Sequence, residues 1–289
     1  MTPQVLALLS SFFYASALVS ARRGLSYSTP ATVTFVSVLT QNVLLWSAIF
    51  LAGGIHRVSG AAVLLFVFVG VSQFGVRIFA YTGVHKIGAS RSSALQAISP
   101  LIATIIAVIA LHEEPLPLVV AGTLLVVGGI VLLSWKAEKQ ISSFRWWHLL
   151  LPVAAACLTG MNHPIRRYAL ALSNEPLFFS ALMGGVSLLS FLAYHALSPA
   201  GDRLIWNRRA IRPFLVTGVA ETFSILFIIT ALSQGAVSVV APIAATYPVW
   251  AMLGTAIFLR DVERINILII LGTLSVVAGT VAIILSPHS

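Results

Sequence analysis

Two ionisable residues lie inside long apolar segments, where a charge is costly unless it faces a partner or a cavity. Glu221 is the only acidic residue well inside such a segment, and Arg77 lies inside another. If both segments are membrane helices of opposite direction, their depths differ by about 4–5 Å at 1.5 Å per residue. We therefore predict a Glu221–Arg77 pair. Arg77 could hold a substrate carboxylate and Glu221 an amino group or a coupling proton; alternatively, the pair only ties two helices together.

The segment of Arg77 carries further polar groups at helical spacing. Gly70, Gln73, Arg77 and Tyr81 follow one another at intervals of three, four and four residues, which places them on one face of a helix. An amide, a guanidinium and a phenol on one face do not suit contact with lipid. This stripe predicts a polar wall of a substrate cavity.

The neighbouring segments add Gln41 before this helix, and Gln96 and Ser99 after it. Polar residues in membrane bundles also form ordinary hydrogen bonds between helices, and for a single Ser or Thr that interpretation is favoured. Gln73 and Gln96 lie near the predicted middle of the membrane, so we expect both to line the cavity.

The second half of the chain offers aromatic and titratable candidates. Tyr247 and Trp250 are three residues apart beside Pro248, and Asn162 and His163 lie together in another segment. Proline removes one backbone hydrogen bond and softens a helix. An aromatic wall near an amide or a cation suits a solute with an apolar body and a charged end. His163 is a second candidate for proton coupling, although a packing role is the commoner one.

Sequence signatures of enzymes and metal sites are missing. The chain has no HExxH, no G-x-S-x-G and no glycine-rich phosphate loop with lysine. His112-Glu113-Glu114 has no distant ligands of a suitable type. We therefore predict neither an enzyme nor a bound metal or cofactor.

Composition assigns the chain to the membrane class. It is 58% hydrophobic and 9% charged over 289 residues, against roughly 25% charged residues in a soluble domain. The net charge of +9 comes from scattered basic residues without a recognition motif. We therefore expect lipid and a small-molecule substrate as partners, and no nucleic acid.

The apolar runs predict an all-α polytopic membrane protein with ten transmembrane helices. The first run is expected to be retained as a helix, because it lacks the features of a signal peptide. The predicted helices are 3–21, 31–51, 61–82, 90–110, 117–135, 147–165, 176–196, 213–233, 237–259 and 265–286.

A repeat divides these helices into two sets of five. Gly122–Val131 and Gly272–Val281 match at seven of ten positions. Equivalent pairs also include Gln73 with Glu221, Glu113 with Asp261, Arg22-Arg23 with Arg166-Arg167, and Ser99-Pro100 with Tyr247-Pro248. Because five is odd, the second half must be inverted in the membrane. We predict a first repeat over 1–138, a linker over 139–146 and a second repeat over 147–289, with Gly128, Gly129 and Gly279 permitting close helix packing.

Loop charge predicts the orientation. Thirteen Lys and Arg residues fall on the side opposite the termini, against Arg57, Arg166 and Arg167 on the side that carries the termini. Basic loops face the cytoplasm, so we expect both termini outside, in the periplasm or extracellular space.

These features resemble the EamA-type carriers of the drug/metabolite transporter superfamily. The resemblance lies in a polar patch at Tyr14-Ala15-Ser16 and Thr159-Gly160, in Gly88–Arg91 mirrored by Gly235–Ser238, and in the repeated proline followed by an acidic residue. Asp261 within RDVER departs from the usual Gly-Glu. The resemblance implies a cavity lined by helices 1 to 4 and 6 to 9, including Tyr14, with helices 5 and 10 as peripheral scaffold. It also implies a bacterial-type inner membrane, with the YddG-type amino acid exporters as the most similar branch.

The sequence thus predicts a monomeric carrier that exports small organic solutes by alternating access. Amino acids with aromatic or other apolar side chains are the leading substrates. The alternatives are a carrier of another metabolite or drug, a channel, or a structural membrane subunit. No ring-forming filter sequence is present, and inverted halves favour alternating access over a channel.

Overall fold

A computed structural model describes residues 1–54, 58–87, 95–134, 146–197, 203–258 and 267–286. All regular structure in these ranges is helical. The helices are α1 (Pro3–Leu25), α2 (Pro30–Leu51), α3 (Gly60–Ile87), α5 (Ser99–Leu111), α6 (Pro117–Ser134), the short 3₁₀ helix η1 (Trp146–Leu149), α7 (Leu150–Leu172), α8 (Pro176–Leu197), α9 (Arg208–Gln234), α10 (Val237–Ala244), α11 (Tyr247–Phe258) and α12 (Ile267–Leu285).

Several helices begin where proline is tolerated best. Pro30, Pro117 and Pro176 are the first residues of α2, α6 and α8, where a missing N–H breaks no helical hydrogen bond. At α2 the Thr29 hydroxyl also accepts from the Thr32 N–H, as an N-cap does. Prolines therefore fix the start of these helices in the sequence itself.

Four helices extend well beyond the apolar runs that predicted them, among them α1, which continues to Leu25. Helix α7 continues to Leu172 and α3 to Ile87, whereas α9 starts five residues early at Arg208. The prediction that Arg166 and Arg167 belong to a loop was wrong, because both lie within α7. Arg167 donates from Nη1 to the carbonyls of Leu232 and Ser233 at the end of α9, both at 3.0 Å. Apolar content marks the middle of a helix better than its ends.

The predicted continuous helix 237–259 is instead two helices, α10 and α11, separated by a turn at Ala245 and Thr246. A turn at Ala97 and Ile98 precedes α5 in the same way. Each turn comes directly before the Ser99-Pro100 or Tyr247-Pro248 pair, as expected from the missing proline N–H and the constraint on the preceding residue. The softening predicted at Pro248 is a full break, and it recurs at the equivalent place in the first half.

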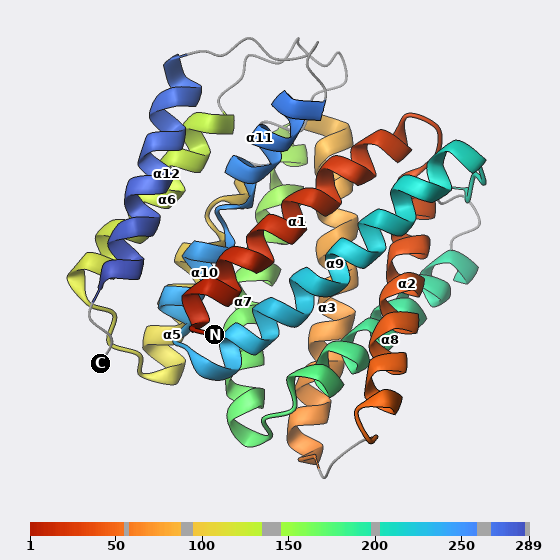
Figure 1. The fold of residues 1–289 in the computed structure, drawn as a ribbon, viewed down its shortest axis with the longest axis horizontal. Helices are drawn as coiled ribbons and strands as arrows, with labels where there is room; N and C mark the ends of the chain where they lie inside the picture. Colours follow the sequence, from red (N-terminus) through yellow and green to blue (C-terminus); the bar gives the residue numbers. More distant parts are fainter. Residues whose placement is uncertain (55–57, 88–94, 135–145, 198–202, 259–266, 287–289) are drawn as a thin grey trace.

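The repeated ten-residue stretch forms a contact between α6 and α12, which lie side by side in Figure 1. A Cβ on Gly122 would lie 2.7 Å from the Gly279 carbonyl, and a Cβ on Gly129 would lie 2.7 Å from the Gly272 carbonyl. Because Gly122 is equivalent to Gly272 and Gly129 to Gly279, each half presents the same residues to the other. This exchange requires antiparallel helices, as expected for inverted repeats. The prediction for Gly128 was wrong, since among the described residues no atom of another helix lies within 4 Å of a Cβ placed there.

The remaining helix contacts also occur in equivalent pairs, in which the two halves change places. Helix α1 packs on α9 as α7 packs on α3, and α2 packs on α9 as α8 packs on α3. The contact of α5 with α7 has its equivalent in α11 with α1. The predicted all-α fold of two inverted repeats is confirmed.

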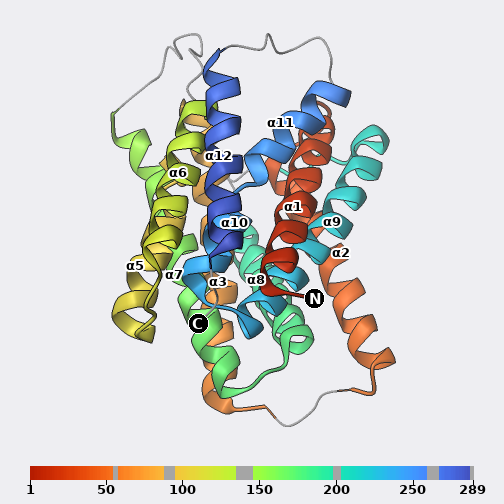
Figure 2. The same ribbon diagram turned by 60° about the vertical axis from the view of Figure 1, so that its left-hand side comes forward.

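Five of the described helices are long and apolar enough to cross a membrane, namely α1, α2, α8, α9 and residues 60–80 of α3. Four shorter apolar helices accompany them. Figure 2 shows the start of α1 and the end of α12 toward the end of the bundle where α2 ends and α3 starts, while the end of α6 and the start of α7 lie at the opposite end. The protein is a multi-pass membrane protein whose termini share one side.

Candidate substrate cavity

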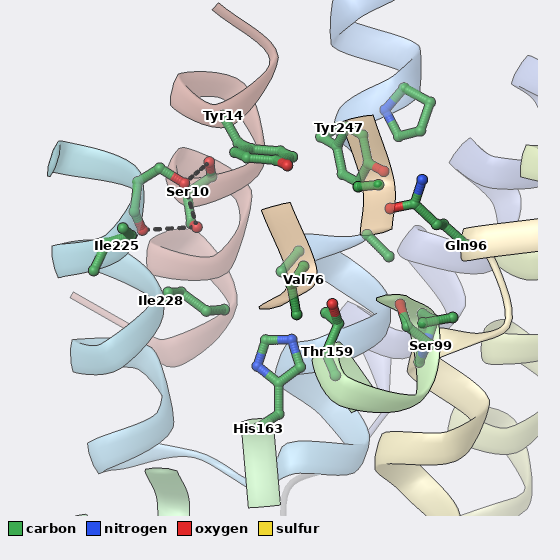
Figure 3. Close-up of a pocket in the computed structure, with 18 of the residues that line it drawn as sticks. Ser10, Tyr14, Val76, Gln96, Ser99, Thr159, His163, Ile225, Ile228 and Tyr247 are labelled. Carbon is green, nitrogen blue, oxygen red and sulfur yellow. Dashed lines mark hydrogen bonds between the residues drawn. The ribbon is translucent and has the colours of Figure 1, made fainter. Parts of the chain in front are cut away.

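A cavity of about 250 Å³ lies between the two halves, slightly below the range of typical small-molecule sites. Its lining comes from α1, α3, α5, α7, α9, α10, α11 and the turns at the two prolines, together with Ile130 of α6. Figure 3 labels ten of these residues, contributed by segments far apart in the sequence. The expected contribution of the second helix of each repeat, α2 and α8, is not found in the described lining. Because Ile130 lines the cavity, α6 is not only the peripheral scaffold that the resemblance implied.

The predicted Glu221–Arg77 pair is present and joins α9 to α3. Arg77 Nη2 lies 3.0 Å from Glu221 Oε2, and both side chains are more than nine-tenths buried. Arg77 also donates from Nη1 to the Ser37 hydroxyl of α2 at 3.1 Å. Two hydrogen bonds and an opposite charge satisfy a buried guanidinium, and the contact crosses from one half to the other.

A second arginine contacts the opposite wall. Arg166 of α7 donates from Nη2 to Gln73 Oε1 of α3 at 2.9 Å and contacts Met183 Sδ at 3.4 Å. Arg166 is only 5% exposed and lines the cavity one helical turn from His163. Arg166 was not among the predicted site residues, because it was assigned to a loop. Its repetition at the position of Arg22-Arg23 and its spacing from His163 were the available signals.

Aromatic rings and aliphatic side chains form the apolar part of the cavity. Tyr14 and Tyr247 meet edge to face with ring centroids 4.8 Å apart, an arrangement that aromatic pairs prefer. In Figure 3 they lie across the cavity from His163, while Ile225 and Ile228 project from α9. The cavity thus combines charged groups with a surface suited to an apolar body.

The structure brings together eight of the twelve residues predicted for the site. These are Tyr14, Gln73, Arg77, Gln96, Ser99, His163, Glu221 and Tyr247. Tyr81 lies on α3, but its side chain falls outside the described residues.

Three predicted site residues lie elsewhere in the fold. Gln41 is 2% exposed and packs against Gly184 between α2 and α8. Asn162 is buried on α7 but does not line the cavity. Trp250 is 37% exposed and meets Phe12 edge to face at 5.7 Å. Each residue was predicted from its polar or aromatic character and its neighbours in the sequence, which do not say which face of a helix meets the cavity.

Glu113 has a structural partner at the end of the bundle. Its carboxylate accepts from the backbone N–H groups of Val237 and Ser238 and from the Ser238 hydroxyl, at 2.8–2.9 Å. These are the first residues of α10, whose free N–H groups favour an anionic acceptor. Within the described residues no group of three or more potential metal ligands occurs. Asp261, the equivalent of Glu113, lies outside them.

Comparison with known proteins agrees with this architecture. The model of the EamA-like transporter family matches residues 1–135 and 145–285. The chain belongs to the EamA-like transporter family. Its members are membrane transporters of small solutes rather than enzymes. The match covers both halves of the chain.

One solved crystal structure of another protein superposes with a TM-score of 0.79, covering 96% of this chain and 95% of that chain at 14% identity. At that identity the likeness shows the fold alone. The search of curated proteins found no match to this chain.

Proposed function

We propose that this EamA-like transporter is a secondary carrier of amino acids with aromatic or other apolar side chains. The observation that carries the proposal is a buried carboxylate and two guanidiniums in one cavity with a tyrosine pair. Among the described residues, Glu221 binds Arg77 through Oε2 alone, so Oε1 is placed to accept a substrate ammonium. The rings supply contacts for an apolar side chain.

The proposed mechanism is alternating access, with the proline breaks as the points of bending. The turns before α5 and before α11 border the cavity and occupy equivalent positions in the two halves. A helix without one backbone hydrogen bond bends at low cost. Bending at one break and then at the other would expose the cavity to each side in turn.

Counterflow in proteoliposomes tests the carrier function. Vesicles loaded with unlabelled L-phenylalanine should transiently accumulate labelled L-phenylalanine above equilibrium, because a carrier exchanges solute across one site. An open channel gives no such overshoot. A panel of other amino acids and metabolites in the same assay addresses the second candidate, a carrier of a different metabolite or drug.

We also propose that Glu221 carries a coupling proton, because it faces the cavity together with Arg77 and Tyr14. Glu221→Gln should abolish the dependence of transport on a pH gradient, whereas Glu114→Gln, an exposed residue in the connection after α5, should retain it. Unchanged pH dependence in Glu221→Gln would contradict the proton role.

The proposed setting is a bacterial inner membrane, with a monomeric carrier exporting its substrate and both termini in the periplasm. Two of the three basic residues assigned to the terminal side, and six of the thirteen assigned to the opposite side, lie within the described helices, so one remains against seven and the charge bias persists. A C-terminal alkaline phosphatase fusion should be active and a C-terminal green fluorescent protein fusion dark. The reverse pattern would place the termini in the cytoplasm.

A further inference from the structure

Equivalent positions on α3 and α9 carry different residues, and each of the two accepts a hydrogen bond from an arginine. Glu221 accepts from Arg77 at 3.0 Å, and its counterpart Gln73 accepts from Arg166 at 2.9 Å. The carboxylate neutralises Arg77. The amide satisfies one donor of Arg166 and leaves its charge uncompensated.

The immediate surroundings of Arg166 offer no negative charge. Its hydrogen-bond partners are the amide oxygen of Gln73 and the thioether of Met183, and no carboxylate forms an ion pair with it among the described residues. Arg166 Nε and His163 Nδ1 are both buried, and neither has a hydrogen-bond partner in the described part of the chain. Arg166 and His163 lie three residues apart on α7, and both line the cavity.

Such an arrangement is costly unless a ligand completes it. A buried charge without an opposite charge destabilises a protein, and ionisable residues inside membrane bundles usually serve a solute pathway. A guanidinium presents its donors in a planar fork that matches the two oxygens of a carboxylate. The described lining contains two guanidiniums and one carboxylate. One positive charge therefore has no counter-charge in this lining, and an anionic group of a ligand would supply it.

We propose that Arg166, together with His163, is the subsite that binds the carboxylate of an organic solute, and that Arg77 is not. The subsite recognises a single carboxylate attached to an apolar body. This inference rests on the proposed function, since it assigns one end of the transported solute to one wall of the cavity. It replaces the earlier expectation that Arg77 holds the substrate carboxylate.

Binding to the full-length protein in lipid nanodiscs tests this assignment without requiring transport. The probes are sodium 3-phenylpropionate and 3-phenylpropionamide, which share an apolar body and differ in charge. Their apparent affinities follow from the shift of the unfolding temperature with concentration. The wild type should bind the acid at least tenfold more tightly than the amide. Equal binding of the two probes would overturn the proposal.

Two matched substitutions, at the equivalent positions 73 and 221, identify which arginine binds the carboxylate. Gln73→Glu places a carboxylate beside Arg166 and should abolish the preference for the acid. Glu221→Gln frees Arg77 and should leave the preference at least as large as in the wild type. The reverse outcome, with the preference lost in Glu221→Gln and kept in Gln73→Glu, would assign the carboxylate to Arg77.

A third variant, a salt control and a separate counterflow measurement complete the test. Arg166→Gln should lose the preference as well, and it substitutes for Gln73→Glu if that variant does not fold. Stabilisation by sodium chloride equal to that by sodium 3-phenylpropionate at the same concentration would show a general inorganic anion site and overturn the proposal. Counterflow is measured separately: lost counterflow with an intact acid preference contradicts only the carrier, and the opposite result contradicts only the subsite.

Discussion

The α6–α12 contact is built from equivalent residues of the two halves, whereas the cavity is built from different ones. At the contact, Gly122 and Gly129 of one half meet Gly279 and Gly272 of the other, so equivalent residues exchange places. In the cavity, the equivalent positions 73 and 221 carry an amide and a carboxylate. The repeat is thus symmetric where it packs on itself and asymmetric in the proposed substrate cavity.

The two regions have different physical requirements. Helices that approach closely across a two-fold axis need small residues at both related positions, because each backbone contacts its own equivalent. A small organic solute has no two-fold axis, so a cavity that binds it needs different groups on its two walls. The departures from the repeat at positions 73 and 221 therefore agree with the proposed role of this cavity.

The largest expected effect comes from breaking the ion pair in the asymmetric region. Arg77→Gln leaves Glu221 buried without its cation, which should lower the free energy of unfolding by about 3–5 kcal/mol. The double variant Arg77→Gln with Glu221→Gln should recover most of this loss, since no lone charge remains. Equilibrium unfolding in bicelles measures both values. A double variant no more stable than Arg77→Gln would show that the ion pair is not the cause.

A smaller effect should follow from breaking the symmetric contact. A Cβ on Gly279 would lie 2.5 Å from the Gly122 carbonyl, and a backbone atom cannot move aside easily. Gly279→Ala should therefore destabilise the protein by about 1–3 kcal/mol. Gly128→Ala is the matched control, because nothing lies within 4 Å of its added Cβ, and alanine there should be neutral or stabilise by up to about 1 kcal/mol. Equal losses in both variants would refute the close contact.

The smallest effect is expected at the second arginine. Arg166→Gln removes a hydrogen bond to a neutral amide but also removes a buried charge without a counter-charge, so the loss should not exceed about 0.5–1.5 kcal/mol in the same unfolding assay. The difference in the free energy of unfolding between Arg77→Gln and Arg166→Gln measures how far the two arginines differ in charge compensation. A loss at Arg166 as large as that at Arg77 would mean that both arginines are paired with a negative charge.

Part of the site could be found from the sequence because membrane helices limit where charges can lie. Glu221 and Arg77 were paired correctly from depth alone, since both are rare ionisable groups in apolar runs. Gln41 and Trp250 were predicted from polar or aromatic character and helical spacing, yet they face other helices or the outside of the bundle. Arg166 was missed because polarity near a helix end looks like a loop until the partner helix is known.

The sequence by itself determined the membrane class, the inverted repeat and the helices with their proline positions. These features depend on composition, local backbone constraints and similarity at fixed spacing. Only the tertiary structure decided which face of each helix meets the cavity, and that Arg166 meets the neutral Gln73 while Arg77 meets Glu221. Those facts depend on the rotation and packing of helices from both halves, which local sequence patterns do not specify.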